Sequence, residues 1–172
     1  EQPEYNTHVP NLVKNLFSKD LYDETMDAYN IYRVNVNSAQ SGVTQVDTNG
    51  VVTTARNTPL DYRYSGVWER CWMEAGPNTN TRLNNILTSL VPQYTYVFII
   101  LNETSGGGCA GGGKLAITRG TSDDNPGWAT AAHEMGHMVG LLADEYWKKC
   151  TLYDGDEPSA VNVTTNTNRK TQ

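Results

Sequence analysis

The sequence predicts a single α+β domain in which a mixed β-sheet is combined with a support helix and a helix that carries a His-Glu-Met-Gly-His motif. Three observations support this fold class. Apolar residues recur at helical spacing in residues 81–90, and residues 94–101 form a nearly continuous β-branched and aromatic run. A later apolar segment places His133 and His137 four residues apart. The length of 172 residues suits one domain.

The amino-terminal half of the chain predicts one helix, one strand and a long irregular region. Apolar residues at helical spacing indicate a short amphipathic helix over residues 9–17. Residues 29–36 alternate with the period of a half-buried strand. Residues 37–78 are dense in Ser, Gly, Asn and Pro but also contain Trp68 and Trp72, so we expect loops and short strands there.

The middle of the chain predicts the support helix and the sheet. The helix over residues 81–90 ends before Pro92, as helices commonly do. Residues 94–101 are best explained as a buried central strand, and residues 114–119 as a shorter strand. The glycine-rich stretch 106–111 formally matches a dinucleotide-binding pattern, but a strand-like run follows where that site needs a helix. We therefore expect residues 106–111 to form a flexible loop near the cleft of the active site, and not a dinucleotide-binding site.

Composition excludes several classes of partner. The net charge is −6 and the sequence pI is near 5.0, so neither nucleic acid nor an anionic membrane surface is an expected partner. Mean hydropathy is −0.55, and the longest apolar run, residues 97–101, is far below the roughly 20 residues that span a bilayer. We expect a soluble protein that interacts with neither.

Cysteine usage leaves the disulfide state open. The three cysteines are Cys71, Cys109 and Cys150, too few for a disulfide-built scaffold and too scattered for a cluster of zinc thiolates. One disulfide could form in an oxidising compartment, but the sequence does not indicate which two cysteines would pair. The triplets that begin at Asn102 and Asn162 match the glycosylation pattern, but chance explains them better in a chain so rich in Asn and Thr.

The His-Glu-Met-Gly-His motif lies on the last predicted helix. Asn125 can cap free amides and Pro126 suits the first turn, so this helix should begin there and run to about Gly140. His133 and His137 project from successive turns, which allows both imidazoles to converge on one Zn²⁺. The chain spends two of its three histidines on this motif. His8, the third, is most simply a surface residue.

The residues around the histidines supply a base and further candidate ligands. Glu134 sits beside the first histidine, where it can accept a hydrogen bond from water instead of binding the metal. Gly140 can adopt the positive φ that turns a chain sharply out of a helix. A third ligand should follow that turn, and Asp144 and Glu145 are both carboxylates of a type that zinc accepts. The alternative for this pair is a solvated acidic surface.

Residues 133–146 resemble the immunoglobulin A peptidase family of bacterial zinc endopeptidases. The resemblance extends over most of the chain. It includes the strand before the glycine loop and the segments 30–36, 41–43 and 157–165, which read Asn-Ile-Tyr-Arg-Val-Asn-Val, Ser-Gly-Val and Glu-Pro-Ser-Ala-Val-Asn-Val-Thr-Thr. The family resemblance implies a metallopeptidase fold similar to that of the metzincins.

The resemblance also implies a role for individual residues. In this family the zinc ligands correspond to His133, His137 and Asp144, and the catalytic base to Glu134. The spacing is similar to that of the metzincin peptidases, but their third ligand would fall on Ala143. A carboxylate one residue further on distinguishes this chain from an ordinary metzincin.

The implied activity is that of a zinc-dependent endopeptidase acting on extracellular proteins. Glu134 would take a proton from the attacking water, and one catalytic Zn²⁺ would be the cofactor. The immunoglobulin A hinge is one candidate substrate, and a secreted or cell-surface location follows from the resemblance. Tyr146 is a candidate to stabilise the tetrahedral intermediate, although packing beneath the ligand turn is the commoner role for such a residue.

Two further expectations concern the extent of the domain and the alternative function. The family's catalytic region continues past the Asn-Val-Thr-Thr segment and usually begins with a strand before the first helix. Residues 1–172 are therefore expected to be one catalytic domain that is incomplete at its carboxyl end and, without that first strand, shortened at its amino end. The alternative is a non-catalytic adhesion or glycan-binding module with a structural metal, in which Trp68 and Trp72 would serve binding.

Overall fold

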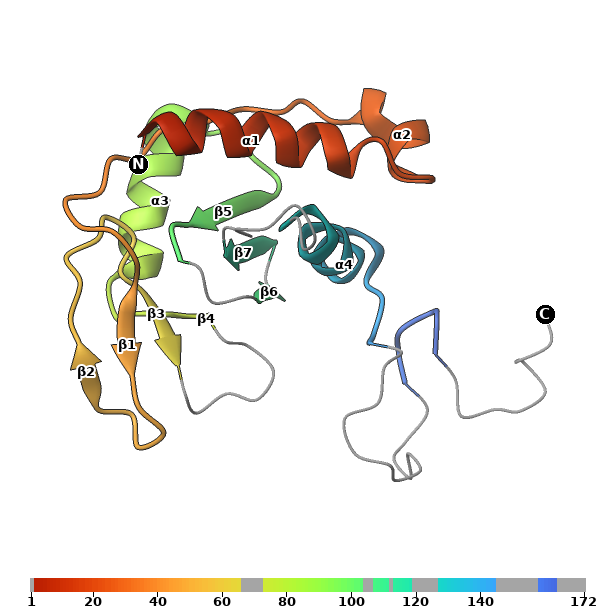
Figure 1. The fold of residues 1–172 in the computed structure, drawn as a ribbon. Coiled ribbons are helices and arrows are strands. Elements are labelled where there is room, and N and C mark those ends of the chain that lie inside the picture. The colour runs from red at the N-terminus through yellow and green to blue at the C-terminus, as the bar shows by residue number, and fades with distance from the viewer. Residues whose placement is uncertain are drawn as a thin grey trace.

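A computed structural model describes residues 2–65, 73–103, 107–111, 113–118, 127–144 and 158–163 of the chain. Helices and strands follow one another as shown in Figure 1. The elements are α1 (Gln2–Leu16), α2 (Tyr22–Thr25), the 3-10 helix η1 (Met26–Ala28), β1 (Thr44–Val46), β2 (Val52–Thr54), β3 (Tyr62–Ser65), β4 (Met73–Ala75), α3 (Thr79–Leu90), β5 (Val97–Leu101), β6 (Gly108–Gly111), β7 (Lys114–Thr118) and α4 (Gly127–Gly140).

The described strands form two small mixed sheets rather than one, within the predicted α+β class. The first has the strand order β2-β1-β3-β4, in which β1 and β3 are parallel and the outer pairs are antiparallel. The second has the order β5-β7-β6, in which β5 and β7 are parallel and β6 and β7 antiparallel.

Within the described ranges, no helix is both long and apolar enough to cross a bilayer.

Strand β5 lies at the centre of the hydrophobic core although, among the described strands, it is at the edge of its sheet. Val97, Ile99 and Leu101 point to one face, where they pack with Leu83 and Leu87 of α3 and with residues of the first sheet. The opposite face of β5 packs against α1 and α4. Apolar packing on both faces, one buried and the other partly buried, explains the continuous apolar run. The predicted central position was wrong among the described strands, because β7 lies between β5 and β6.

Three other predicted elements are confirmed. The amino-terminal helix covers the predicted residues 9–17 up to Leu16 and begins earlier, at Gln2, with Pro10 inside it. The support helix is α3, which starts two residues before the predicted Thr81 and ends at the predicted Leu90. Strand β7 matches the predicted segment 114–119 to within one residue.

The predicted strand at residues 29–36 is not formed. This segment runs back along α1 with no ladder partner (Figure 1). Its contacts go to the helix: Tyr5 donates a hydrogen bond to the Val34 carbonyl at 3.1 Å, and the Arg33 guanidinium lies 5.3 Å from the centroid of the Tyr5 ring. Ile31 and Tyr32 are both more than half exposed, so neither face of the alternating pattern is buried.

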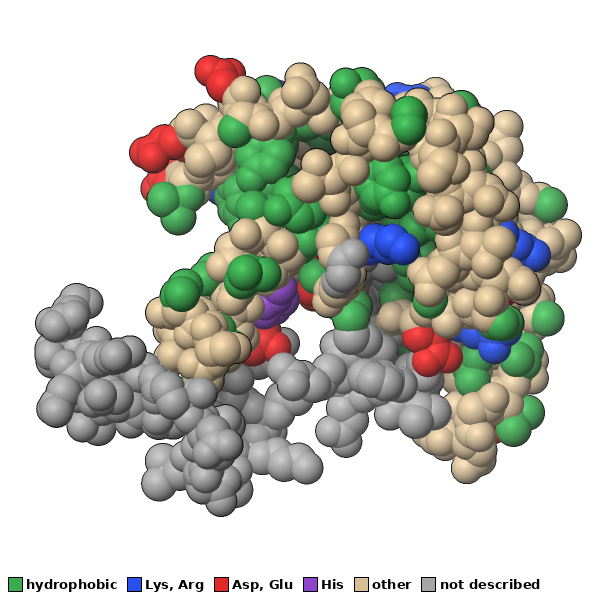
Figure 2. Space-filling model, turned by 180° about the vertical axis from the view of Figure 1, so that it is seen from behind, with side chains coloured by type: hydrophobic (Ala, Val, Ile, Leu, Met, Phe, Trp, Pro, Cys, Tyr) green, Lys and Arg blue, Asp and Glu red, His purple; other side chains and the backbone are tan. Residues whose placement is uncertain are grey.

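A large apolar cavity lies between this segment, α1 and β5. Its volume is about 740 Å³, and its walls include Leu12 and Val13 of α1 and Phe98 and Ile100 of β5. Hydrophobic side chains are visible on both sides of the chain that crosses this face of the molecule (Figure 2). The segment 29–36 thus covers the cavity without extending the sheet.

A tight turn joins β1 to β2 and depends on one glycine. The Asp47 carboxylate accepts hydrogen bonds from the backbone N–H groups of Asn49 and Val51 at 2.9 and 2.8 Å. These bonds stabilise the charged form and lower the pKa of Asp47. Gly50 donates to the Asp47 carbonyl at 3.0 Å with φ of 80°, a conformation that glycine adopts without steric cost.

Replacing Gly50 tests this turn. Gly50→Ala should lower the free energy of unfolding by about 1 kcal/mol, because an alanine Cβ is unfavourable at positive φ. Gly50→Asn should lose clearly less, since asparagine tolerates this region. Urea unfolding followed by circular dichroism measures both. Equal losses for the two variants would contradict the conformational explanation, because no atom within 4 Å opposes a Cβ at this position.

Candidate metal centre

Helix α4 carries the motif and is anchored by its buried face. Ala131, Met135 and Met138 are buried and pack with residues of α1, β5 and β6. Tyr22, the first residue of α2, donates a hydrogen bond of 2.7 Å to the Ala132 carbonyl of α4. The helix ends at Gly140, as predicted, whereas its expected start at residues 125 and 126 lies outside the described residues.

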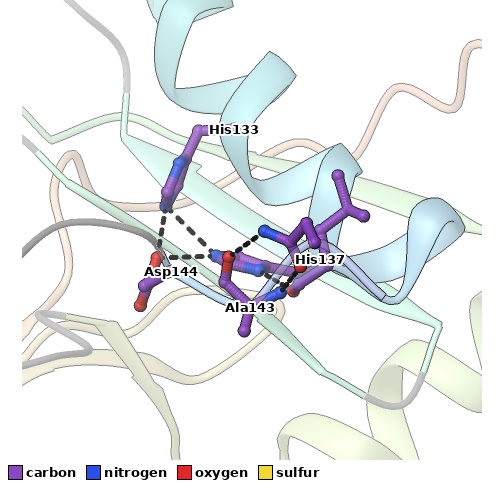
Figure 3. A network of polar contacts seen from close by, with 6 residues as sticks. His133, His137, Ala143 and Asp144 are labelled. Atoms are coloured by element: carbon purple, nitrogen blue, oxygen red, sulfur yellow. Dashed lines mark hydrogen bonds and ion pairs between the residues drawn. The ribbon is translucent and has the colours of Figure 1, made fainter. Parts of the chain in front are cut away.

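Three predicted ligands converge at the end of this helix. The Nε2 atoms of His133 and His137 are 3.1 Å apart, and each lies 3.0 Å from Oδ1 of Asp144. The two rings project from successive turns of α4 toward the aspartate, which follows the helix (Figure 3). These three residues form the one group of possible metal ligands within the described part of the chain.

The site is accessible from outside. The side chain of His133 is 40% exposed, that of His137 24% and that of Asp144 16%. Histidine side chains lie in a hollow of the surface with acidic side chains beside them (Figure 2). Both histidine side chains are therefore partly open to solvent, while Oδ1 of Asp144 is itself buried beneath them.

The orientation of His137 is set by the loop that follows the helix. Its Nδ1 lies 2.6 Å from the carbonyl oxygen of Leu142, and a carbonyl can only accept a hydrogen bond. Nδ1 must therefore carry the proton, and in the neutral ring Nε2 presents a lone pair toward Asp144 and His133. This is the arrangement in which metal-binding histidines are usually held by their neighbours.

The turn out of α4 is made differently from the prediction. The positive φ expected at Gly140 belongs to Leu141, whose φ is 53°, while Gly140 is still helical. Gly140 instead provides space, because a Cβ there would come within 3.1 Å of Leu142 Cγ. Leu142 donates a backbone hydrogen bond of 3.2 Å to the Gly136 carbonyl, so the loop folds back onto the helix. The glycine is needed for close approach rather than for its conformational freedom.

Asn162 contacts the same loop and was not predicted as part of the site. Its side-chain Oδ1 accepts a hydrogen bond from the backbone N–H of Ala143 at 2.9 Å, and its Nδ2 donates to the Ala143 carbonyl at 2.8 Å. Ala143 immediately precedes Asp144. The sequence showed Asn162 only as part of an Asn-Val-Thr triplet, and a contact across 19 residues leaves no local pattern.

Glu134 is the most buried acidic group of the site. Its exposed fraction is 8%, and the backbone N–H of Ala110 in β6 donates a hydrogen bond to its carboxylate. Burial raises the pKa of Glu134, while His133, His137 and the Ala110 N–H act in the opposite direction. A carboxylate with a raised pKa is better suited to accept and release a proton near neutral pH than an exposed one.

The glycine-rich stretch forms part of the wall of the site, because it contains Ala110, whose backbone N–H donates to Glu134. Residues Gly108–Gly111 form strand β6, which pairs antiparallel with β7, so the predicted flexible loop was wrong for these residues. Cys109 in this strand is disulfide-bonded and cannot act as a thiolate ligand. Cys71 and Cys150 lie outside the described residues.

Of the remaining candidate residues, His8 is the one that the structure describes, and it lies away from the site. His8 is half-buried on α1 and lines the apolar cavity. Glu145, the other candidate for the third ligand, and Tyr146, a candidate for stabilising the intermediate, lie outside the described residues, as do Trp68 and Trp72.

The converging atoms fit a metal ion. Ligand atoms about 2.0 Å from a tetrahedral Zn²⁺ stand roughly 3.3 Å apart, close to the separations of 3.0 to 3.1 Å found here. Two imidazoles and a carboxylate are also a known catalytic donor set for zinc. Because His137 Nε2 and the Asp144 oxygen both present lone pairs, their approach is favourable only with a cation or a proton between them.

An α+β domain with this helix, its convergent carboxylate and a buried neighbouring glutamate has the arrangement of a metallopeptidase centre. The comparison with protein families agrees. The model of the IgA Peptidase M64 family matches residues 1–172, so the chain belongs to this family and is a peptidase. Neither the curated proteins nor the solved structures gave a match.

Gly136 and Gly140 of α4 both face Leu142, so replacing each of them in turn tests the contact between this loop residue and the helix. A Cβ at Gly136 would meet Leu142 Cδ1 at 3.5 Å, an ordinary contact, whereas one at Gly140 would meet Leu142 Cγ at 3.1 Å. Gly136→Ala should raise the free energy of unfolding by about 0.5–1 kcal/mol, because alanine is the better helix former.

Gly140→Ala should show no such gain and should weaken zinc binding, since Leu142 and its carbonyl must move away from His137. Urea unfolding and a zinc titration measure the two effects. If both variants were stabilised equally and bound zinc equally, the close approach of Leu142 would have no role.

Proposed function

We propose that the chain is a zinc-dependent endopeptidase with one catalytic Zn²⁺ bound by His133, His137 and Asp144. The observation that carries this proposal is the convergence of two imidazole nitrogens and one carboxylate oxygen within 3.1 Å beside a buried glutamate. Membership of the peptidase family supports the same conclusion. Hydrolysis of a peptide bond is the proposed reaction.

The protein groups have distinct tasks in this reaction. Zinc, when bound, supplies Lewis-acid polarisation of the scissile carbonyl and lowers the pKa of water toward ~7. Glu134 accepts the proton of the attacking water and returns it to the leaving amine. The Ala110 N–H holds its carboxylate in place from β6. The Leu142 carbonyl keeps His137 in the tautomer that has a lone pair on Nε2.

A catalytic role is favoured over a purely structural metal. Structural zinc sites usually have four protein ligands, whereas catalytic sites have three and leave a position open for water or substrate. Three ligand groups converge within the described residues, and His133 is 40% exposed. Glu134, which is not one of the converging ligands, is the base that such an open position requires. No observation favours the alternative of an adhesion or glycan-binding module.

The substrate class follows from the family, and its finer identity is a proposal. A peptidase acts on proteins or peptides, and the family description refers to immunoglobulin A. We propose extracellular proteins as substrates, with the immunoglobulin A hinge as one candidate, and a secreted or cell-surface location for the enzyme. Cleavage-site mapping in a peptide library, followed by digestion of purified immunoglobulin A, would identify the substrate.

Glu134→Gln separates metal binding from catalysis. The amide is similar in size but cannot accept a proton at neutral pH, so the variant should keep the parental zinc affinity and lose about 10²–10⁴-fold in the rate of cleavage. Zinc content is measured by metal analysis, and cleavage with a peptide from the mapped library. A variant that cleaved as fast as the parent would show that Glu134 is not the base.

The histidines provide an internal control for zinc binding. His137→Ala should reduce zinc affinity by several orders of magnitude, because it removes one of three ligands, whereas His8→Ala should leave it unchanged. Excess zinc at 100 times its dissociation constant should stabilise the parent and His8→Ala by about 2.7 kcal/mol against unfolding. Calorimetry with and without a chelator measures this. Stabilisation of His137→Ala by the same amount would place the metal elsewhere.

A further inference from the structure

Asn162 clamps the loop that carries the third ligand. The contact is bidentate, with the amide oxygen on the Ala143 N–H at 2.9 Å and the amide nitrogen on the Ala143 carbonyl at 2.8 Å. One side chain thus satisfies both backbone groups of the residue before Asp144, in the manner of a neighbouring β-strand. Both residues are half-buried, so the two hydrogen bonds are partly protected from competing water.

The loop that leads from α4 to Asp144 is attached at two places, to α4 at Leu142 and to Asn162 at Ala143. On the helix side, Leu142 is tied to α4 through the Gly136 carbonyl at 3.2 Å and through His137 Nδ1 at 2.6 Å. Beyond Leu142, the contacts of Asn162 hold the Ala143 backbone. Fixing the peptide units on either side of Ala143 restricts the rotations that would swing the Asp144 carboxylate away from the two histidines.

Asn162 is itself presented by a short turn. Val163 donates a backbone hydrogen bond of 3.4 Å to the Ala160 carbonyl, and the intervening Val161 is 86% exposed. Val161 points away while its neighbour faces the loop. This contrast explains why two adjacent residues should differ in their importance for the site.

We propose that Asn162 is a positioning residue that sets zinc affinity by holding Asp144 in place through the backbone of Ala143. This inference rests on the proposed zinc site. Groups that orient a metal ligand without touching the metal commonly contribute 10–100-fold to metal affinity or activity. Asn162→Ala should therefore bind zinc about 10–100-fold more weakly than the parent, and high zinc should restore part of its activity.

The isosteric variant Asn162→Asp distinguishes the clamp from a general effect on folding. Its carboxylate can still accept from the Ala143 N–H but cannot donate to the Ala143 carbonyl. An added negative charge near a cation would by itself strengthen zinc binding. Weaker zinc binding by Asn162→Asp therefore supports the clamp, and binding as tight as that of the parent, or tighter, opposes it. Val161→Ala, on the same turn, is the control that should match the parent.

The decisive measurement is a double-mutant cycle with Asp144→Ala. Zinc dissociation constants are obtained by competition with a chromophoric chelator, and thermal unfolding of the zinc-free proteins checks the fold. If Asn162 acts through Asp144, Asn162→Ala should have little further effect once Asp144 is removed. Fully additive losses would overturn the proposal.

The same assay separates the two levels of inference. If the parent protein itself binds no zinc, the proposed zinc site fails, and with it the role of Asn162. If the parent and His8→Ala bind zinc, His137→Ala does not, and Asn162→Ala matches the parent, only the clamp is wrong. The Co²⁺-substituted proteins add a spectroscopic check, because a displaced Asp144 should alter the visible absorption of the metal in Asn162→Ala but not in Val161→Ala.

Discussion

The site depends on holding two imidazole nitrogens and one carboxylate oxygen within 3.1 Å of one another. Electron-rich atoms do not gather this closely unless a cation or shared protons offset their repulsion. The surrounding structure must therefore oppose their separation. It does so with a well-packed helix on one side. On the other side is a loop in which the backbone groups of Leu142 and Ala143 are hydrogen-bonded.

Helix α4 is held in place because its buried face packs against both α1 and β5. Met135 and Met138 lie in adjoining clusters that connect α4 to α1 and to the Phe98 face of β5. Strand β6 approaches the same helix from the sheet and reaches Glu134 through the Ala110 N–H. The core thus sets both the direction of the histidines and the position of the base. Helical spacing alone would place the two rings on one face but would not orient them.

The elements that could be predicted from sequence share a local cause. Apolar spacing identified α3, and the β-branched run identified β5, because each pattern reflects burial of a whole face. Residues 29–36 show a strand pattern but lie along α1 instead. Tyr5 of α1 holds the segment there through a hydrogen bond to the Val34 carbonyl and a contact of its ring with the Arg33 guanidinium. An alternating pattern indicates which side chains could be buried together. It does not show whether another segment of the chain is available to pair with a strand, so it cannot by itself predict one.

The candidate site divides in the same way. The spacing of His133 and His137 and the adjacent Glu134 follow from helix geometry, so the sequence alone determined that one helix presents two imidazoles on successive turns with a carboxylate beside them. Only the tertiary structure brought Asp144 to the histidines, showed that Gly140 provides space for Leu142, and revealed Asn162 on the Ala143 backbone. These relations arise between segments that meet only after folding, and backbone hydrogen-bonding groups are the same for nearly every residue type. No local pattern of side chains could therefore record them.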